Sequence, residues 1–184
     1  MILPINYCSS CGSKTGRSIP EGEDRERDVC LQCGAIHYLN PKVIVGCLAE
    51  HQGRILLCKR AIEPRYGLWT LPAGFMENGE TTAEGAARET REEAAAVAEN
   101  LCLYHLFDVP QINQIYVFYR CGIQNGEFGV GPESLDSNLY TPDEIPWDKL
   151  AFPVVKELLE KFLSDTEKGS YPIRQSVIRH PRKR

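Results

Sequence analysis

The chain contains 184 residues, of which 42% are hydrophobic and 25% charged, and it carries a formal net charge of −4 at pH 7. These values suit a globular protein with one main core and a small satellite unit, and the slight acidity argues against general nucleic-acid binding. No apolar run approaches membrane-spanning length and the N-terminus lacks a secretory signal pattern, so we expect a cytosolic protein without membrane contact.

Cysteines define the first predicted domain, residues 1–38. Two C-x-x-C-G motifs occur there, and eighteen residues lie between the second cysteine of the first motif and the first cysteine of the other. This spacing indicates a structural Zn²⁺ site, and four thiolates leave no coordination position for a catalytic water. Disulfides or a redox motif are the alternative, which a reducing compartment disfavours. The predicted ligands are Cys8, Cys11, Cys30 and Cys33.

Other features of this domain do not indicate nucleic-acid binding. The stretch 12–29 carries four basic and five acidic side chains, which makes it a poor partner for a phosphate backbone. His37 follows Cys33 closely, but because four cysteines are already available we expect it to be structural. The remaining cysteines stand in apolar, strand-like surroundings and are expected to be buried packing residues. They are Cys47, Cys58, Cys102 and Cys121.

A run of strands is predicted next. Residues 42–50 and 54–60 are rich in aliphatic side chains and flank His51-Gln52-Gly53, which predicts a hairpin. Residues 69–75 are expected to form a strand that ends in Pro72-Ala73-Gly74, where small residues allow the main chain to approach a ligand closely.

The segment 74–96 predicts a helix with a cluster of acidic side chains. Thr81 and Glu84 form a capping-box pattern, and an alanine-rich run continues to about Val97. Glutamates at positions 89, 92 and 93 fall on one helical face, where they would repel one another unless cations were shared among them. Arg88 is one such cation, but one arginine cannot neutralise three carboxylates. Clustered hard oxygen ligands suit Mg²⁺ or Mn²⁺. The alternative is a solvated, salt-bridged surface helix.

Two more strands, a loop and a helix complete the pattern. Strands are predicted at 101–109 and 112–123, a glycine-rich loop at 124–138, and a closing helix at 147–163 with an apolar core face. Strands on either side of a central helix, with a terminal helix behind, indicate an α/β/α sandwich around a mixed β-sheet, which we place at residues 39–165.

The last predicted segment is a basic tail at residues 166–184. Residues 174–184 carry five basic side chains and no acidic one, without apolar periodicity. We expect a flexible solvated tail, with an interaction arm as the alternative.

The acidic helix also resembles a known motif, the Nudix box. The box has the form G, five residues, E, seven residues, R-E-U-x-E-E-x-G-U, where U is bulky and apolar. Six residues match it in register, namely Gly74, Glu80, Arg88, Glu89, Glu92 and Glu93. Three positions depart, Thr90, Ala95 and Ala96, and they put local packing rather than chemistry in question. With the cysteine motifs, the chain resembles the Nudix subgroup with an N-terminal zinc ribbon, whose fold is again the α/β/α sandwich.

The resemblance implies roles for these residues. Glu89 and Glu93 would be direct Mg²⁺ ligands, and Glu92 a ligand or a base acting on water. Arg88 would orient the carboxylates and Glu80 would hold Arg88 or a water. The carbonyl of Ala73 would join the metal shell. A loop carboxylate commonly contributes in this family, and Glu133 is the candidate, with Asp136 beside it; plain surface residues are the alternative for both.

The resemblance further implies hydrolysis of a nucleotide diphosphate. Motifs at 37–42, 143–147 and 150–153 look like ADP-ribose or FAD pyrophosphatase-like proteins, whereas residues 108–114 lack the SQPWPFPxS-type motif of NADH pyrophosphatases. We therefore expect hydrolysis of ADP-X to AMP and X-phosphate. Adenine would stack on an aromatic side chain, and the alternative is that these aromatic side chains only pack within the protein or at the pocket rim. The candidates are Tyr66, Trp69 and Tyr116. NADH hydrolysis, a nucleotide-sensing regulator without catalysis, and RNA-cap processing remain alternatives, and whether a homodimer completes the site stays open.

Overall fold

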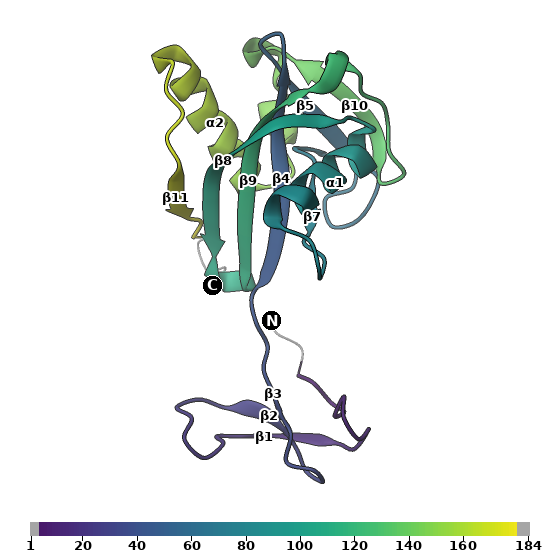
Figure 1. Cartoon of the computed structure of the whole chain (residues 1–184), viewed down its shortest axis with the longest axis vertical. Helices are drawn as coiled ribbons and strands as arrows, with labels where there is room; N and C mark the ends of the chain where they lie inside the picture. Colours follow the sequence, from purple (N-terminus) through teal and green to yellow (C-terminus); the bar gives the residue numbers. More distant parts are fainter. Residues whose placement is uncertain (1–3, 180–184) are drawn as a thin grey trace. The chain divides into compact units, whose positions relative to one another are not determined.

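A computed structural model describes residues 4–179, which divide into two compact units at Pro41/Lys42. The first unit contains a three-stranded antiparallel sheet of order β1-β2-β3 (Figure 1). Its strands are β1 Thr15–Ser18, β2 Arg27–Cys30 and β3 Ile36–His37. The two cysteine motifs lie at turns that flank this small sheet. Because the unit has so few buried apolar residues, a metal site is the expected source of its stability.

The second unit is built on an eight-stranded mixed sheet. The order is β10-β5-β4-β9-β8-β11, with β6 added to β5 and β7 added to β4. Strands β4 and β9 run parallel, as do β8 and β11, and the other pairs are antiparallel. The strands are β4 Lys42–His51, β5 Arg54–Arg60, β6 Trp69–Thr70, β7 Ala73–Phe75, β8 Ala98–Val109, β9 Gln114–Ile123, β10 Ser134–Tyr140 and β11 Arg174–Val177.

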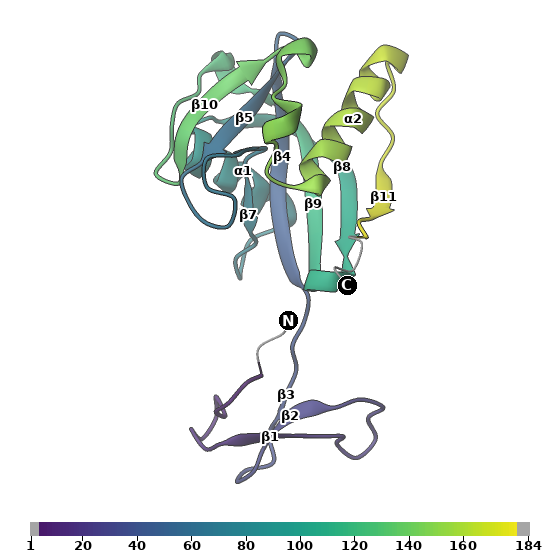
Figure 2. The same ribbon diagram turned by 180° about the vertical axis from the view of Figure 1, so that it is seen from behind.

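Two helices, α1 Thr82–Ala94 and α2 Pro153–Lys168, cover opposite faces of this sheet. Alternate residues of β4 divide between two cores: Val45 and Cys47 pack with α1, and Leu48 packs with α2. Figure 2 shows the face that α2 covers. The period of two along the strand therefore places one apolar set on each face. The predicted α/β/α sandwich is confirmed. Short 3₁₀ turns occur at Pro110–Ile112, Gln124–Gly126, Pro142–Glu144 and Trp147–Lys149.

Several predicted boundaries move in the structure. The predicted hairpin is confirmed, but the strand expected over 69–75 breaks at Leu71-Pro72 into β6 and β7. The glycine-rich loop is shorter than predicted because β10 begins at Ser134. The closing helix starts at Pro153 and not at Trp147, since proline occupies its first turn, where no amide donor is needed.

Helix α1 also ends earlier than predicted, at Ala94. Ala95 adopts a left-handed conformation with φ 48°, and its amide donates to the Arg91 carbonyl to close the last turn. Here the chain leaves the helix and enters β8 at Ala98. Glycine is favoured in such a conformation, and it is the residue that the box pattern has at this position. The departure at Ala95 therefore places a side chain in a strained region of the backbone.

One prediction about cysteine burial is wrong. Cys47, Cys58 and Cys121 are buried as expected, but Cys102 is exposed. The pairing of β8 with β9 shifts register on both sides of Cys102, between Glu99 and Cys102 and again between Leu103 and His105. These irregularities change which face a side chain takes, and the apolar composition of the segment does not reveal them.

The stretch expected to be a flexible tail is ordered over most of its described part. Helix α2 continues to Lys168, and β11 pairs in parallel with β8. Arg174 forms an ion pair through two nitrogens with the buried Asp165 of α2, and His105 of β8 hydrogen bonds Ser176. Residues 180–184, which carry the last three basic side chains of the predicted tail, lie outside the described residues. No helix in residues 4–179 is long and apolar enough to cross a membrane.

Candidate active site

A pocket of about 620 Å³ opens in the second unit beside α1. Its walls come from β4, β7, β9, the loop before β10 and the first turn of α2. One part of the lining is charged and includes Arg60, Glu89, Glu92, Glu93 and Glu133. The other part is apolar and aromatic and includes Ile44, Phe75, Ile112, Tyr116 and Phe152. A pocket with both kinds of wall suits a ligand with a charged and a flat apolar end.

The start of α1 is fixed by the predicted capping box. The Thr81 hydroxyl accepts a bond from the Glu84 amide at 3.2 Å, and the Glu84 carboxylate accepts one from the Thr81 amide at 2.7 Å. Gly74 at the centre of β7 then allows the helix to lie close, because a Cβ there would come within 2.4 Å of the Glu89 carboxylate. The box glycine therefore makes room for an acidic side chain of the facing helix.

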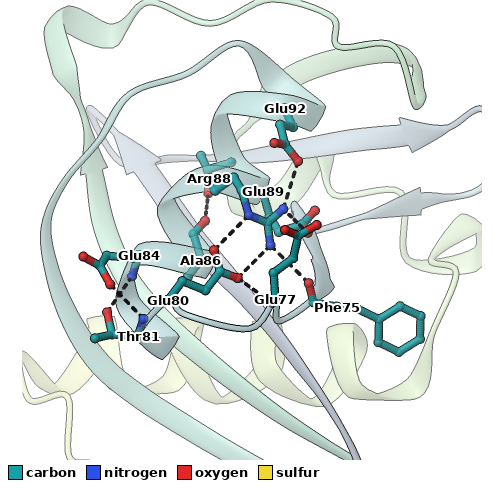
Figure 3. Close-up of polar contacts among 10 residues, drawn as sticks. Phe75, Glu77, Glu80, Thr81, Glu84, Ala86, Arg88, Glu89 and Glu92 are labelled. Atoms are coloured by element: carbon teal, nitrogen blue, oxygen red, sulfur yellow. Dashed lines mark hydrogen bonds and ion pairs between the residues drawn. The ribbon is translucent and has the colours of Figure 1, made fainter. Parts of the chain in front are cut away.

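Arg88 holds three acidic side chains together (Figure 3). Its guanidinium donates to Glu80 at 2.9 and 3.0 Å, to Glu89 at 2.7 Å and to Glu92 at 2.9 Å. A fifth bond, at 3.1 Å, goes to the carbonyl of Phe75. Arg88 keeps the pKa of Glu80 at about 2, with help from the Glu77 amide. This network uses the fork of donors that only arginine provides.

Glu93 is the buried member of the acidic group, and Glu89 is partly buried. Burial raises the pKa of Glu89 despite its contact with Arg88. Glu93 is only 5% exposed, and burial raises its pKa to about 8; the Ala73 amide and Arg60 oppose this shift, while Glu89 and Glu133 add to it. Its carboxylate accepts one bond from the Ala73 amide at 3.3 Å. Among the described residues no lysine or arginine forms an ion pair with Glu93.

The structure brings the predicted loop carboxylate into the same pocket. Glu133 lines it, and its negative charge raises the pKa of both Glu89 and Glu93. Asp136 lies outside the pocket lining and accepts a bond from the Ser137 amide at 2.9 Å. Ala73 lies in the lining, as the resemblance requires. The predicted metal ligands, the arginine and the loop glutamate are therefore assembled from α1, β7 and the loop before β10.

Two further pocket residues escape sequence reasoning, Arg60 and Phe75. Arg60 ends β5, is 9% exposed, and donates through Nε to the carbonyl of Pro64 at 3.0 Å. A charged residue that closes an apolar strand is the one hint of it in the sequence. Phe75 is half exposed at the pocket, beneath the Lys42 ammonium at 4.8 Å.

The three aromatic candidates for adenine stacking separate in the structure. Tyr116 lines the pocket, and its hydroxyl donates to Gln114 at 3.0 Å. Trp69 is 7% exposed within the core, and Tyr66 is exposed outside the pocket lining. Of the departures from the box pattern, Thr90 is fully buried and its hydroxyl donates to the Ala86 carbonyl at 2.8 Å.

A separate four-cysteine cluster lies in the first unit. One sulfur from each of Cys8, Cys11, Cys30 and Cys33 falls within 4.8 Å of the others, the only such group of potential ligands among residues 4–179. The Cys33 and Gln32 amides lower the pKa of the Cys30 thiol, which favours the thiolate that binds metal. Four converging sulfurs fit tetrahedral structural zinc. His37 is not part of the cluster.

Comparison with known proteins agrees with both units. The NUDIX domain model matches residues 39–162, and the Nudix N-terminal zinc-ribbon model matches residues 6–39. The chain belongs to the Nudix hydrolase family. A solved NUDIX hydrolase from Nitrosomonas europaea is 44% identical with a TM-score of 0.91, over 95% of this chain and 99% of that one.

Curated proteins similar to this chain include an ADP-ribose pyrophosphatase and NAD-capped RNA hydrolases. An ADP-ribose pyrophosphatase of Methanocaldococcus jannaschii is 31% identical over 119 residues, which are 62% of this chain and 69% of the relative. The NAD-capped RNA hydrolase NudC of Erwinia tasmaniensis is 29% identical over 157 residues, or 84% of this chain. The chain spans only 58% of the length of that NudC.

Proposed function

We propose that this Nudix pyrophosphatase hydrolyses ADP-X compounds such as ADP-ribose or FAD to AMP and X-phosphate, with Mg²⁺ or Mn²⁺ as cofactor. The observation that carries the proposal is a pocket lined both by a group of carboxylates and by apolar and aromatic side chains. The carboxylates suit a diphosphate with its cation, and the apolar and aromatic side chains suit a flat base.

The donor set fits a hard divalent cation. Glu93 is a buried carboxylate with one amide donor and no ion-pair partner among residues 4–179, and Glu89 lies beside it in the pocket. Carboxylate oxygens are the preferred ligands of Mg²⁺ and Mn²⁺. We assign Glu89 and Glu93 as ligands, with the carbonyl of Ala73. When bound, the cation offsets the negative charge of the diphosphate and lowers the pKa of water.

The chain's other residues orient this set and handle the proton. Arg88 fixes Glu89 and Glu92, and Glu80 fixes Arg88. In the reaction, water oxygen bonds to one phosphorus of the anhydride, the bridging P–O bond breaks, and the bridging oxygen leaves with the other phosphoryl group. A carboxylate takes the water proton. Glu92 and Glu133 are exposed enough to do so, and separate replacement by glutamine distinguishes them.

Arg60 and the aromatic side chains of the pocket bind the second phosphate and the base of the substrate. Arg60 is buried, and within residues 4–179 no carboxylate forms an ion pair with it, so its charge is available to a substrate phosphate. Phe75 and Tyr116 line the apolar side, where a base can stack. Arg60 therefore binds the phosphate that the cation leaves uncovered.

A panel of substrates tests this proposal. ADP-ribose, FAD, NADH, NAD-capped RNA, diadenosine polyphosphates and nucleoside triphosphates are incubated with Mg²⁺ or Mn²⁺, and the products are identified by mass. We expect AMP and X-phosphate from ADP-ribose or FAD, and none without divalent cation. Equal turnover of every compound would contradict the ADP-X preference.

Hydrolysis of nicotinamide dinucleotides is the second candidate. It is favoured by the similarity to NudC, which covers 84% of this chain. Preferential cleavage of NADH or NAD-capped RNA in the same panel would support it, and a steep loss of RNA cleavage with added salt would indicate contacts to the RNA backbone. Nucleotide binding without any AMP release would instead indicate a sensor.

A further inference from the structure

The loop at residues 129–134 contacts the C-terminal end of α1 and carries Glu133, a residue of the proposed active site. The Gly129 amide donates to the Ala94 carbonyl at 2.6 Å, and the Gly131 amide donates to the Glu93 carbonyl at 3.0 Å. Carbonyls in the last turn of a helix have no partner within the helix, so this loop supplies the donors that α1 lacks. Glu133, two residues after Gly131, lines the pocket with the glutamates of α1.

The other end of the loop is fixed as well. The Glu133 carbonyl accepts a bond from the Ala61 amide at 2.8 Å, and the Ser134 amide donates to the Gly131 carbonyl at 3.1 Å. Because Ala61 directly follows β5, the backbone of Glu133 is held between the end of α1 and the end of that strand. Glu133 is thus exposed at its side chain but fixed at its main chain.

Gly131 is the point where loop and helix lie closest. A Cβ at this position would come within 1.7 Å of the Glu92 carbonyl oxygen and 2.9 Å of the Glu93 carbonyl carbon. Both contacts are to main-chain atoms, which cannot rotate away as a flexible side chain would. Gly129 lies in the same loop, yet a Cβ there would meet only the Ala95 methyl group, at 3.4 Å, an ordinary contact.

If residue 131 carried a side chain, the loop would have to move, because α1 is held more firmly. The facing turn of α1 is held by its own helical bonds and by the buried Thr90 and Ala94. The loop has no apolar core of its own, since Val130 and Pro132 on either side are exposed. Displacing it moves Glu133 relative to Glu89 and Glu93.

We propose that Gly131 is a positioning residue for the proposed active site, since its missing side chain lets the loop dock on the end of α1 and hold Glu133 beside the metal-binding glutamates. The inference rests on the proposed metal-dependent function. Glu133 adds negative charge next to Glu89 and Glu93, which favours a bound cation. Moving it away should therefore weaken divalent-metal binding even where no reaction takes place.

The test measures Mn²⁺ binding without substrate, by the electron paramagnetic resonance of free Mn²⁺. Gly131→Ala is compared with its matched control Gly129→Ala, with Glu133→Ala, and with the double variant Gly131→Ala/Glu133→Ala. We expect Gly131→Ala to raise the Mn²⁺ dissociation constant about tenfold, the usual size for a lost supporting contact, and Gly129→Ala to stay near wild type. In the Glu133→Ala background, Gly131→Ala should add little, because both changes remove the same interaction.

Two results would overturn the proposal: wild-type Mn²⁺ affinity in Gly131→Ala, or effects of the two changes that multiply in the double variant. A general loss of folding would affect the helix content as well, so circular dichroism accompanies each titration. If Gly131→Ala does not fold, the series is repeated with Ala95→Gly, which relieves the left-handed strain at Ala95 and offsets the loss of stability. Because no turnover is needed, failure to hydrolyse ADP-X would reject the proposed function and leave this test in force.

Discussion

The cysteine cluster and the glutamate pocket both gather potential metal ligands, but they do so in opposite ways. In the cysteine cluster the sulfurs lie within 4.8 Å of one another, with Cys11 and Cys30 only 3.5 Å apart. In the pocket the carboxylates come from α1 and from the loop before β10, and Arg88 bonds Glu89 and Glu92 of the pocket as well as Glu80.

This difference separates a structural site from a chemical one. A closed set of thiolates has no position for a reactant, so its binding energy goes into folding. An open set of partly buried carboxylates has ligands without full partners, which is costly for the fold and useful for binding a cation with its substrate. Loss of the first site should therefore act on stability, and loss of the second on turnover.

The largest effect should follow removal of one cysteine motif. Cys30→Ser with Cys33→Ser leaves two sulfurs, too few to hold zinc, and residues 4–41 should lose their ordered structure. Zinc content by mass spectrometry and amide hydrogen exchange measure this result. Turnover per molecule with Mg²⁺ should stay within about twofold of wild type, because every proposed catalytic residue lies in the second unit. A loss of turnover equal to that of an active-site variant would break the distinction between the sites.

The next effect should come from Glu93→Gln. Replacing a buried carboxylate ligand should lower kcat roughly a thousandfold, or about 4 kcal/mol, while thermal melting shows a folded protein. Asp136→Asn is the matched control, since it makes the same change outside the pocket and should retain near-wild-type turnover. Similar kcat values for the two variants would remove Glu93 from the site.

A smaller effect concerns the ion pair between Asp165 and Arg174, which holds β11. Hydrogen bonding from Arg174 lowers the pKa of Asp165 below its unfolded value although burial opposes this. The pair therefore stabilises the fold above the unfolded pKa of about 4, and this contribution is lost as the pH falls through the lower folded value. Asp165→Asn should cost about 1–3 kcal/mol in urea unfolding at pH 7. A cost that persisted unchanged at pH 2 would contradict the assignment.

The smallest expected effect is a gain in stability. Ala95→Gly removes a side chain from a residue with φ 48° and should stabilise the second unit by about 1 kcal/mol, with turnover unchanged. Thermal unfolding measures it. A loss of stability would show that the Ala95 methyl group contributes packing that outweighs the strain of its backbone.

Features that depend on residues close together in the sequence could be predicted. Features that depend on contacts between residues far apart in the sequence could not. The cysteine motifs, the capping box at Thr81 and the acidic face of α1 depend on residues a few positions apart, so their geometry follows from turn and helix periods. Arg60 lies at the end of β5. It lines the pocket because β5 is the neighbour of β4, the strand that packs against α1.

The C-terminal strand and the loop at Gly131 show the same limit. Strand β11 has only one apolar side chain, Val177. It is held by contacts with other elements, between Arg174 and Asp165 of α2 and between Ser176 and His105 of β8. In the sequence Gly131 looks like any loop glycine. Only the structure shows that it lies against the end of α1. Cys102 was mispredicted because the bulges in β8 depend on its pairing with β9.

Product analysis of ADP-ribose hydrolysis is the sharpest test of whether the glutamate pocket is the active site of an ADP-X pyrophosphatase. Wild type and Glu93→Gln are incubated with ADP-ribose, and in parallel with FAD, with Mg²⁺ in ¹⁸O-labelled water, and the products are identified by mass. With ADP-ribose we expect AMP and ribose 5-phosphate from wild type, one labelled oxygen in one of the two products, and almost no product from Glu93→Gln. Equal AMP release by both proteins, or none by wild type with FAD and ADP-ribose alike, would contradict this expectation.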